Sequence, residues 1–245
     1  MNLVSNFYKT EEPLRSLIRN LAANSSALTL DVACKKGDTS ESLAEHVGKL
    51  IALDKVFFKE WAGQGKNVHF VNGDASCLPF RGERFDTVVA CECLQYLEDP
   101  LSAIEEIHRI LKPGGSLVMS FPEGNASAHF LNPYTLADQV KTLTCQRASS
   151  RRVKPVRAEE ILRFCERQWK KEVFLRRGTL LFIYSAFILE KLQLLREFAE
   201  KKGWLWFGNR ILAPSLKIFF FLMKADFSLR LAFMSYNNII RLRKL

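Results

Sequence analysis

The chain has 245 residues, of which 48% are hydrophobic and 25% are charged, a composition that excludes a globally disordered protein. Its length allows either one large α/β domain or one such domain with a helical addition. The net charge is +10, and no apolar stretch reaches the roughly 18 residues of a membrane-spanning helix, so none is expected.

From Ala27 onward, strands and helices alternate along the sequence, a pattern that predicts a parallel sheet. Residues 1–26 are expected to form an N-terminal helical extension. Strands are predicted at Ala27–Val32, Lys49–Asp54, Val68–Asn72, Phe85–Cys91 and Ser116–Phe121. Asp99 is the expected N-cap of the helix before the last of these strands, because Pro100 then takes the first helical position, which proline favours.

The second half of the chain supplies the rest of a predicted seven-stranded, mostly parallel sheet. Glu172–Leu175 is expected to be a short strand, and Leu216–Met223 (LKIFFFLM) the last strand, buried on both faces. Between them, Leu180–Glu200 is expected to form a long amphipathic helix. We therefore predict an α/β domain over residues 27–225, followed by a basic amphipathic tail at 226–245.

Three acidic residues follow successive strands of the predicted sheet. Asp31 lies near the end of the first strand, Asp54 ends the second, and Asp74 follows the third. Ligands of open α/β sheets bind beyond the carboxyl ends of the strands. There, Asp54 can accept from two ribose hydroxyls, and Asp74 from an exocyclic amine such as that of adenine. An acid after a strand is often only a helix cap, but three in order predict a site for a nucleotide-like ligand.

Short motifs after these strands resemble one known family. They are Gly73-Asp74-Ala75, Leu78-Pro79-Phe80, Phe85-Asp86, Glu92-Cys93-Leu94-Gln95-Tyr96-Leu97 and Pro113-Gly114-Gly115. In this order they resemble the class I S-adenosylmethionine-dependent methyltransferases, of the small-molecule and lipid type that includes the ubiquinone and menaquinone methyltransferases. The resemblance covers about Ala27–Pro122. It implies a Rossmann-like sheet with helices on both faces and S-adenosyl-L-methionine as cofactor.

The resemblance also assigns roles to individual residues. Asp54 would bind the ribose hydroxyls, and Asp74 and Ala75 would hold the adenine. Cys91 would line the methionine side of the pocket. The strand Leu216–Met223 would match the antiparallel last strand of the family, and Gly178–Gly203 the helical insert that often shapes the acceptor pocket.

The loop Asp31–Gly37 departs from the family pattern, in which alternating glycines follow an acid. By resemblance, the cofactor-binding positions of this loop are Asp31, Ala33, Lys35 and Gly37. The methyl group of Ala33 is tolerated if its φ is negative. At Lys35, a positive φ would cost roughly 1–2 kcal/mol. The Lys35 ammonium would then either pair with the cofactor's carboxylate or block its seat.

Methyl transfer from a sulfonium depends mainly on alignment of the acceptor, and a base is needed only where the acceptor loses a proton. The candidates for this base are Tyr96, His129 and Tyr134, near the ends of the fourth and fifth strands. Tyr96 stands where family members often carry histidine, and a tyrosine is the poorer base at neutral pH. For His129, the plainer interpretation is a loop histidine packed on a neighbour.

The six cysteines form no Cys-x-x-Cys pair. Cys91 and Cys93 lie two apart at the end of a predicted strand and are expected to pack as small hydrophobic side chains. We therefore expect no metal site and a reduced, cytoplasmic protein.

The charge is unevenly distributed along the chain. Residues 141–245 hold 23 Lys and Arg against 8 Asp and Glu, whereas residues 1–140 hold 13 against 18. Residues 141–245 also contain 11 of the 19 Phe and 3 of the 4 Trp. Three interpretations stay open: a solubilising coat over a helical subdomain, peripheral contact with an anionic membrane, and, less favoured, contact with nucleic acid.

The expected membrane contact is the tail, where one helical face carries apolar residues. Leu229, Phe233, Tyr236 and Ile240 recur at helical spacing, with basic residues outside this stripe.

Three functions are compatible with the sequence. The favoured one is an active methyltransferase for a small apolar or lipid-linked acceptor, because Asp54 and Asp74 are present. The second is a non-catalytic protein of the same fold that acts as a partner or scaffold, because Ala33 and Lys35 replace glycines. The third is an RNA methyltransferase that uses the basic half to bind its substrate.

Overall fold

The computed structural model describes residues 13–63, 67–124, 154–204, 206, 208–228 and 237–245. The chain divides into two compact units. The first, which we call the sheet unit, comprises residues 14–124, 151–175 and 237–245. The second, which we call the helical unit, comprises residues 1–13, 125–150 and 176–236.

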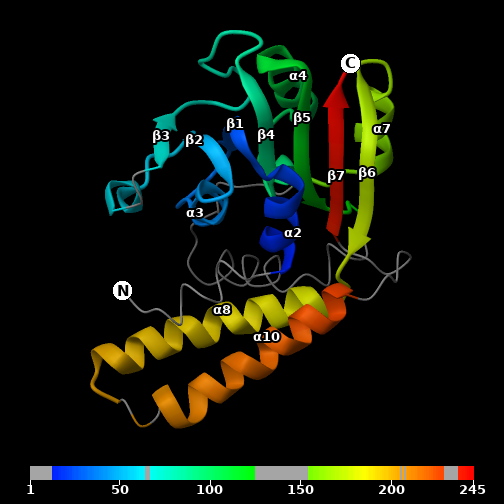
Figure 1. The fold of residues 1–245 in the computed structure, drawn as a ribbon. Coiled ribbons are helices and arrows are strands. Elements are labelled where there is room, and N and C mark those ends of the chain that lie inside the picture. Colours follow the sequence, from blue (N-terminus) through cyan, green and yellow to red (C-terminus); the bar gives the residue numbers. More distant parts are fainter. Residues whose placement is uncertain (1–12, 64–66, 125–153, 205, 207, 229–236) are drawn as a thin grey trace. The chain divides into compact units, whose positions relative to one another are not determined.

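The sheet unit is built on seven strands (Figure 1). They are β1 (Asn24–Val32), β2 (Val47–Asp54), β3 (Val68–Asn72), β4 (Phe85–Cys91), β5 (Leu111–Pro122), β6 (Trp169–Arg177) and β7 (Asn237–Lys244). Their order in the sheet is β3-β2-β1-β4-β5-β7-β6. The pairs from β3 to β5 are parallel, whereas β7 is antiparallel to β5. The predicted α/β, Rossmann-like and mostly parallel fold is confirmed.

Short helices precede or connect the strands of the sheet unit. They are α2 (Pro13–Ala22), α3 (Asp38–Ala44), α4 (Pro100–Ile110), α7 (Ala158–Cys165) and the 3-10 turns η1 (Lys59–Gly63) and η2 (Leu94–Tyr96). Asp99 caps α4, because its side chain accepts from the backbone N–H groups of Leu101 and Ser102, and Pro100 is the first helical residue. This cap is confirmed as predicted.

The central strands are mostly buried over their paired residues, as expected for parallel strands that are covered on both faces. Leu30 on β1, Val88 on β4 and Leu117 on β5 are fully buried. The chain moves outward from β1 to β3 and then returns to place β4 on the other side of β1. The loops after β1 and β4 therefore diverge, which makes the carboxyl ends of these two strands the expected ligand position.

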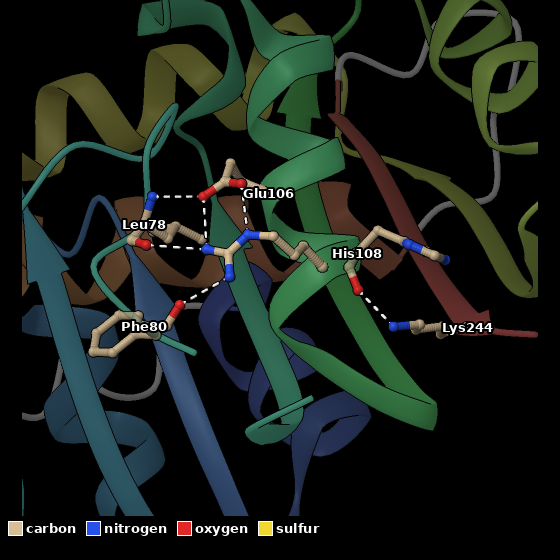
Figure 2. Close-up of polar contacts among 6 residues, drawn as sticks. Leu78, Phe80, Glu106, His108 and Lys244 are labelled. Atoms are coloured by element: carbon tan, nitrogen blue, oxygen red, sulfur yellow. Dashed lines mark hydrogen bonds and ion pairs between the residues drawn. The ribbon is translucent and has the colours of Figure 1, made fainter. Parts of the chain in front are cut away.

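A polar clamp fixes the segment Leu78–Phe80 to α4 (Figure 2). Glu106 Oε2 accepts from the Leu78 N–H at 2.8 Å, and the Arg109 guanidinium donates to the carbonyl oxygens of Leu78 at 3.1 Å and Phe80 at 2.9 Å. Glu106 and Arg109 also form an ion pair at 2.7 Å. This clamp holds the chain that leaves β3.

The last strand of the sheet is not the one predicted. Leu216–Met223 lies within helix α10 (Ala213–Ser228), and β7 comes from Asn237–Lys244, inside the predicted tail. A short apolar run does not distinguish a buried strand from a buried helix, which explains the first error. The prediction of a helical tail is wrong for Asn237–Lys244, which includes Ile240; Leu229, Phe233 and Tyr236 lie outside the described residues.

The basic side chains of β7 bind within the sheet unit. Arg241 and Arg243 both pair with Glu172 on β6, and the Arg243 contact holds the pKa of that carboxyl below its usual range. Lys244 Nζ donates to the carbonyl oxygen of His108 at 2.8 Å (Figure 2) and to that of Leu111 at 2.8 Å, and thereby satisfies the end of α4. These cations stabilise the sheet.

The helical unit contains a helix hairpin. Helix α8 (Leu180–Lys201) packs along α10, and the two are joined through the π-helical turn η3 (Gly208–Leu212) (Figure 1). Helix α8 occupies most of the predicted helical insert at 178–203.

The position of β7 predicts that its apolar residues are essential for folding. Ile240 is fully buried, so Ile240→Ala should lower the free energy of unfolding by about 2–5 kcal/mol, as for other large-to-small core changes. The matched control is Leu245→Ala, which removes a 69% exposed side chain just after the strand and should change stability by less than about 0.5 kcal/mol. Urea denaturation measures both, and equal effects would contradict the assignment of β7.

Candidate functional site

The loop after β1 adopts a left-handed backbone at alternate residues. The φ angles of Ala33, Lys35 and Gly37 are 57°, 52° and 94°. A positive φ suits glycine, but costs roughly 1–2 kcal/mol at Ala33 and again at Lys35 because each carries a Cβ atom. The methyl group of Ala33 is tolerated without strain only at a negative φ. The observed φ is positive, so this condition is not met. The loop therefore keeps the conformation of a glycine loop with only one glycine.

Asp54 at the end of β2 holds this loop in place. Its carboxylate is 6% exposed, and its two oxygens accept from the backbone N–H groups of Lys35 and Val56, each at 2.9 Å. The neighbouring Cys34 N–H donates to the Leu53 carbonyl at 3.0 Å. A hydrogen bond to an ionised carboxylate is stronger than one between two neutral groups. The bonds to Asp54 therefore offset part of the strain in the loop.

Asp31 is a buried carboxyl at the same end of the sheet. It is 1% exposed, and Ser40 donates to its Oδ2 at 2.6 Å. Burial raises the pKa of Asp31 to about 7, although the hydrogen bond from Ser40 and the charge of Arg15 act in the opposite direction. A positively charged ligand group nearby would compensate this desolvation and favour the carboxylate.

Asp74 follows β3 and is paired with a residue that the sequence analysis did not single out. Lys55 Nζ lies 2.7 Å from Asp74 Oδ2, and the Ser76 N–H donates to Oδ1 at 2.9 Å. The contact with Lys55 holds the pKa of Asp74 below its usual range. Lys55 comes directly after Asp54, so its place at the strand end was the available signal. Ala75 is buried beside Asp74.

The Lys35 side chain reaches the residues that follow β4. Its Nζ lies 4.8 Å from the centroid of the Tyr96 ring, a cation–π distance, and Tyr96 is 41% exposed on η2. Lys35 therefore extends from the loop after β1 to the turn after β4, which are the two loops that diverge at the carboxyl ends of the strands.

Trp61 is a second residue that sequence reasoning missed. Its indole Nε1 donates to the Lys35 carbonyl at 2.8 Å, and its ring stacks on Phe70 with a centroid distance of 5.0 Å. Phe57 and Phe58 pack against the same ring. The aromatic residues crowded after β2 were the available signal, and they give the strained loop an apolar support.

The end of β4 also turns sharply. Glu92 has a φ of 51°, and its N–H donates to the Ser120 carbonyl at 2.9 Å. Ser120 also donates to Cys91 Sγ at 3.5 Å, while desolvation raises the pKa of Cys91 to about 12 and keeps it a neutral thiol. Gln95 is buried and donates to the Glu92 carbonyl at 3.1 Å.

The structure thus brings most of the predicted site residues to the carboxyl ends of β1, β2, β3 and β4. They are Asp31, Ala33, Lys35, Gly37, Asp54, Asp74, Ala75, Cys91 and Tyr96. His129 and Tyr134, the other two candidate bases, lie outside the described residues. The carboxyl groups of Asp31, Asp54 and Asp74, together with the backbone N–H groups of the loop after β1, can bind a ligand that carries both positive charge and hydroxyl groups.

Known proteins share this sequence pattern and this fold. Residues 30–119 match the family described as Methyltransferase domain. Demethylmenaquinone methyltransferase of Staphylococcus saprophyticus is 30% identical over 128 residues, which are 48% of this chain and 54% of that protein. The chain thus spans about half the length of the curated relatives it matches.

Solved structures with little sequence identity have the same fold. The cyclase SpnF superposes with a TM-score of 0.62 at 18% identity, over 95% of this chain and 80% of that chain. The 1,6-didemethyltoxoflavin-N1-methyltransferase of Burkholderia thailandensis, solved with 1,6-didemethyltoxoflavin and S-adenosylhomocysteine, gives 0.56 at 15% identity, over 96% and 80%. The strand order, the motifs after the strands and the domain match together show that residues 30–119 are similar to the methyltransferase domain and that the sheet has the fold of the solved methyltransferases.

Proposed function

We propose that the protein transfers the methyl group of S-adenosylmethionine to a small apolar or lipid-linked acceptor. The observation that carries the proposal is the hydrogen bonding of Asp54 to the left-handed loop after β1, because it keeps the conformation of a glycine loop in a segment with only one glycine. The acceptor class is supported by the relative named demethylmenaquinone methyltransferase. Such an acceptor resides in a bilayer, so the proposal includes a cytoplasmic protein in peripheral contact with a membrane.

The residues at the carboxyl ends fit this cofactor chemically. Asp54 would accept from the ribose hydroxyls with its remaining lone pairs, and Asp31 would balance positive charge on the ligand. Asp74 and Ala75 would lie beside the adenine. The Lys35 ammonium would leave the Tyr96 ring and pair with the ligand carboxylate. When bound, the cofactor supplies an electrophilic methyl group that needs no further activation, so the protein has to align the acceptor and exclude water.

Tyr96 is the described residue best placed to meet an acceptor. It follows β4 and is exposed beside the Lys35 ammonium. A phenol at this position can orient an acceptor hydroxyl by hydrogen bonding, or receive its proton where the acceptor must lose one.

The second candidate function is that of a non-catalytic partner or scaffold. The positive φ angles of Ala33 and Lys35 favour it, since both side chains lie where the family has glycine. The third candidate, an RNA methyltransferase, would transfer label from radioactive S-adenosylmethionine into RNA rather than into an apolar acceptor.

Calorimetric titration of S-adenosylmethionine and S-adenosylhomocysteine tests the enzyme proposal. The wild type should bind both ligands. Asp54→Asn should bind them at least about tenfold more weakly, because an amide cannot accept from both backbone N–H groups and the ribose. Thermal melting of the variant serves as the folding control. No heat from either ligand at high concentrations of the wild type would favour the non-catalytic function.

A series at Lys35 separates charge from strain. Lys35→Met keeps the Cβ atom at positive φ but removes the ammonium, and should weaken cofactor binding by about tenfold or more. Lys35→Arg should retain most of the affinity. Lys35→Gly should raise the free energy of unfolding by about 1 kcal/mol, because it relieves the left-handed strain, while it also weakens binding. Tighter binding by Lys35→Met would show instead that the lysine blocks the site.

The buried carboxyl of Asp31 predicts a pH dependence. Its pKa is raised to about 7, so the folded state holds this proton more tightly than the unfolded chain, and its contribution to stability falls as the pH rises from about 4 to about 7. A bound cation favours the carboxylate. Affinity for S-adenosylmethionine should therefore increase from about pH 6 to about pH 8, with proton release at the lower pH.

Calorimetry in buffers of different ionisation enthalpy measures this proton release. Asp31→Asn should abolish both the release and the rise in affinity with pH. A variant that keeps the wild-type pH profile would show that another group titrates.

A further inference from the structure

Exposed apolar side chains concentrate on the α8–α10 hairpin. Of the fourteen large apolar side chains that are exposed in the described part of the chain, ten lie between Leu181 and Phe221. Trp204 and Trp206, in the turn that joins the two helices, are 58% and 64% exposed. Ile211 follows them, also exposed. Apolar surface gathered in this way is typical of an interaction site.

The turn that presents Trp204 is an ordered helix end. Gly203 has a left-handed φ of 76°, and the Trp204 N–H donates to the Ala199 carbonyl at 2.9 Å, which is the bond of a Schellman cap. The Trp204 ring packs edge-on against Phe198 at 6.3 Å, the apolar contact that accompanies such a cap. The indole is thereby held in place while most of it stays exposed to solvent.

The hairpin holds itself together with other residues. Helix α10 buries one face, formed by Leu216, Phe220, Met223 and Phe227, and exposes Ile218 and Phe221 on the opposite face. At the other end, the Asp226 carboxylate accepts from the Thr179 N–H at 2.7 Å and from its hydroxyl at 2.8 Å, which joins the end of α10 to the start of α8. The exposed apolar residues are therefore available to a partner.

Cations accompany these apolar residues. The segment Lys201–Lys217 contains four basic residues and no acid. All four, Lys201, Lys202, Arg210 and Lys217, have exposed side chains. Lys202 Nζ lies 5.9 Å from the Phe198 ring centroid, so the lysine extends along apolar surface and ends in a charge. Tryptophan beside lysine and arginine is the composition of a surface that rests in the headgroup region of a bilayer.

We propose that the turn of the α8–α10 hairpin docks onto the surface of an anionic lipid bilayer. Trp204, Trp206 and Ile211 enter the interface, and the cations of Lys201–Lys217 contact the phosphates. Within the described ranges, no helix combines the length and the apolarity needed to cross a bilayer, so the contact is made at the surface. The docking goes beyond the proposed methyl transfer and does not depend on bound cofactor, although it would bring the protein to a lipid-linked acceptor.

A bilayer suits this surface better than a second copy of the chain. In a symmetric contact through the turn, the four cations of Lys201–Lys217 would face their equivalents without an acid in the segment to pair with. An anionic bilayer complements both features, since it offers phosphates to the cations and an apolar layer to the indoles. The attraction amounts to roughly a factor of five in partitioning for each basic residue near the surface.

Sedimentation with lipid vesicles tests the proposal on the full chain without cofactor. The wild type should bind vesicles of phosphatidylcholine with phosphatidylglycerol, and bind phosphatidylcholine alone much more weakly. Lys201→Gln with Lys202→Gln should weaken binding by about thirtyfold. Trp204→Ser with Trp206→Ser should weaken it by about tenfold or more, because the indoles supply the apolar contact.

Two control variants make changes of the same kind away from the turn. Lys170→Gln with Lys171→Gln neutralises two adjacent exposed lysines of β6, and Leu245→Ser removes a 69% exposed apolar side chain of the sheet unit. Both should bind vesicles as the wild type does. Thermal melting confirms folding of each variant.

Three outcomes would overturn the proposal. They are absence of binding to anionic vesicles by the wild type, equal binding by the turn variants and the wild type, and concentration-dependent dimerisation that the tryptophan substitutions abolish. The test is independent of the methyltransferase proposal, because the turn variants should retain the wild-type affinity for S-adenosylmethionine. Loss of vesicle binding alone therefore concerns the hairpin, whereas loss of cofactor binding concerns the site.

Discussion

The candidate site depends on the hydrogen bond between the Asp54 carboxylate and the Lys35 N–H. Ala33 and Lys35 have left-handed φ angles that together cost roughly 2–4 kcal/mol, so an isolated segment of this sequence would not hold this shape. The structure fixes Lys35 through both peptide units that flank its Cα, because Asp54 accepts from its N–H and Trp61 donates to its carbonyl. The neighbouring Cys34 N–H is bound by β2 as well. The parallel pairing of β1 with β2 brings these groups together, and so the fold maintains the loop.

Because the fold maintains the loop, only some features of the site could be predicted from the sequence. The strand ends and the acids that follow them are local patterns, and Asp31, Asp54 and Asp74 all lie where a parallel sheet places them. The sign of φ at Ala33 depends on contacts with residues about 20 positions away, which no local pattern contains. Two other contacts, Lys55 with Asp74 and Trp61 with Lys35, likewise join residues that are far apart in the sequence. The sequence therefore predicts where the site lies, while the pairing within it requires the fold.

The errors in the second half have a related cause. LKIFFFLM and NNIIRLRK are both plausible strands, and the choice between them depends on the space left beside β5 rather than on either segment. The segment that fills this position is β7. It buries Ile239, Ile240 and Leu242, and its arginines pair with Glu172. The basic half of the chain consequently serves two purposes. The cations of β7 bind carboxylates and carbonyl groups of the sheet unit, whereas those of Lys201–Lys217 remain exposed around the tryptophans.

The fold alone does not determine the chemistry, because a cyclase shares it with methyltransferases. The strained residues are the feature that points to a functional site. A glycine at position 35 would relieve the left-handed strain and keep both backbone hydrogen bonds, since neither involves the lysine side chain. What glycine would lose is the ammonium group, which lies over Tyr96 between the loops after β1 and β4. A surface cation–π contact is worth about 0.5–1 kcal/mol, which is less than the strain, so the lysine is not explained by stability. A charge held at this position is explained if a ligand with an anionic group binds beside it, and the carboxylate of S-adenosylmethionine is such a group.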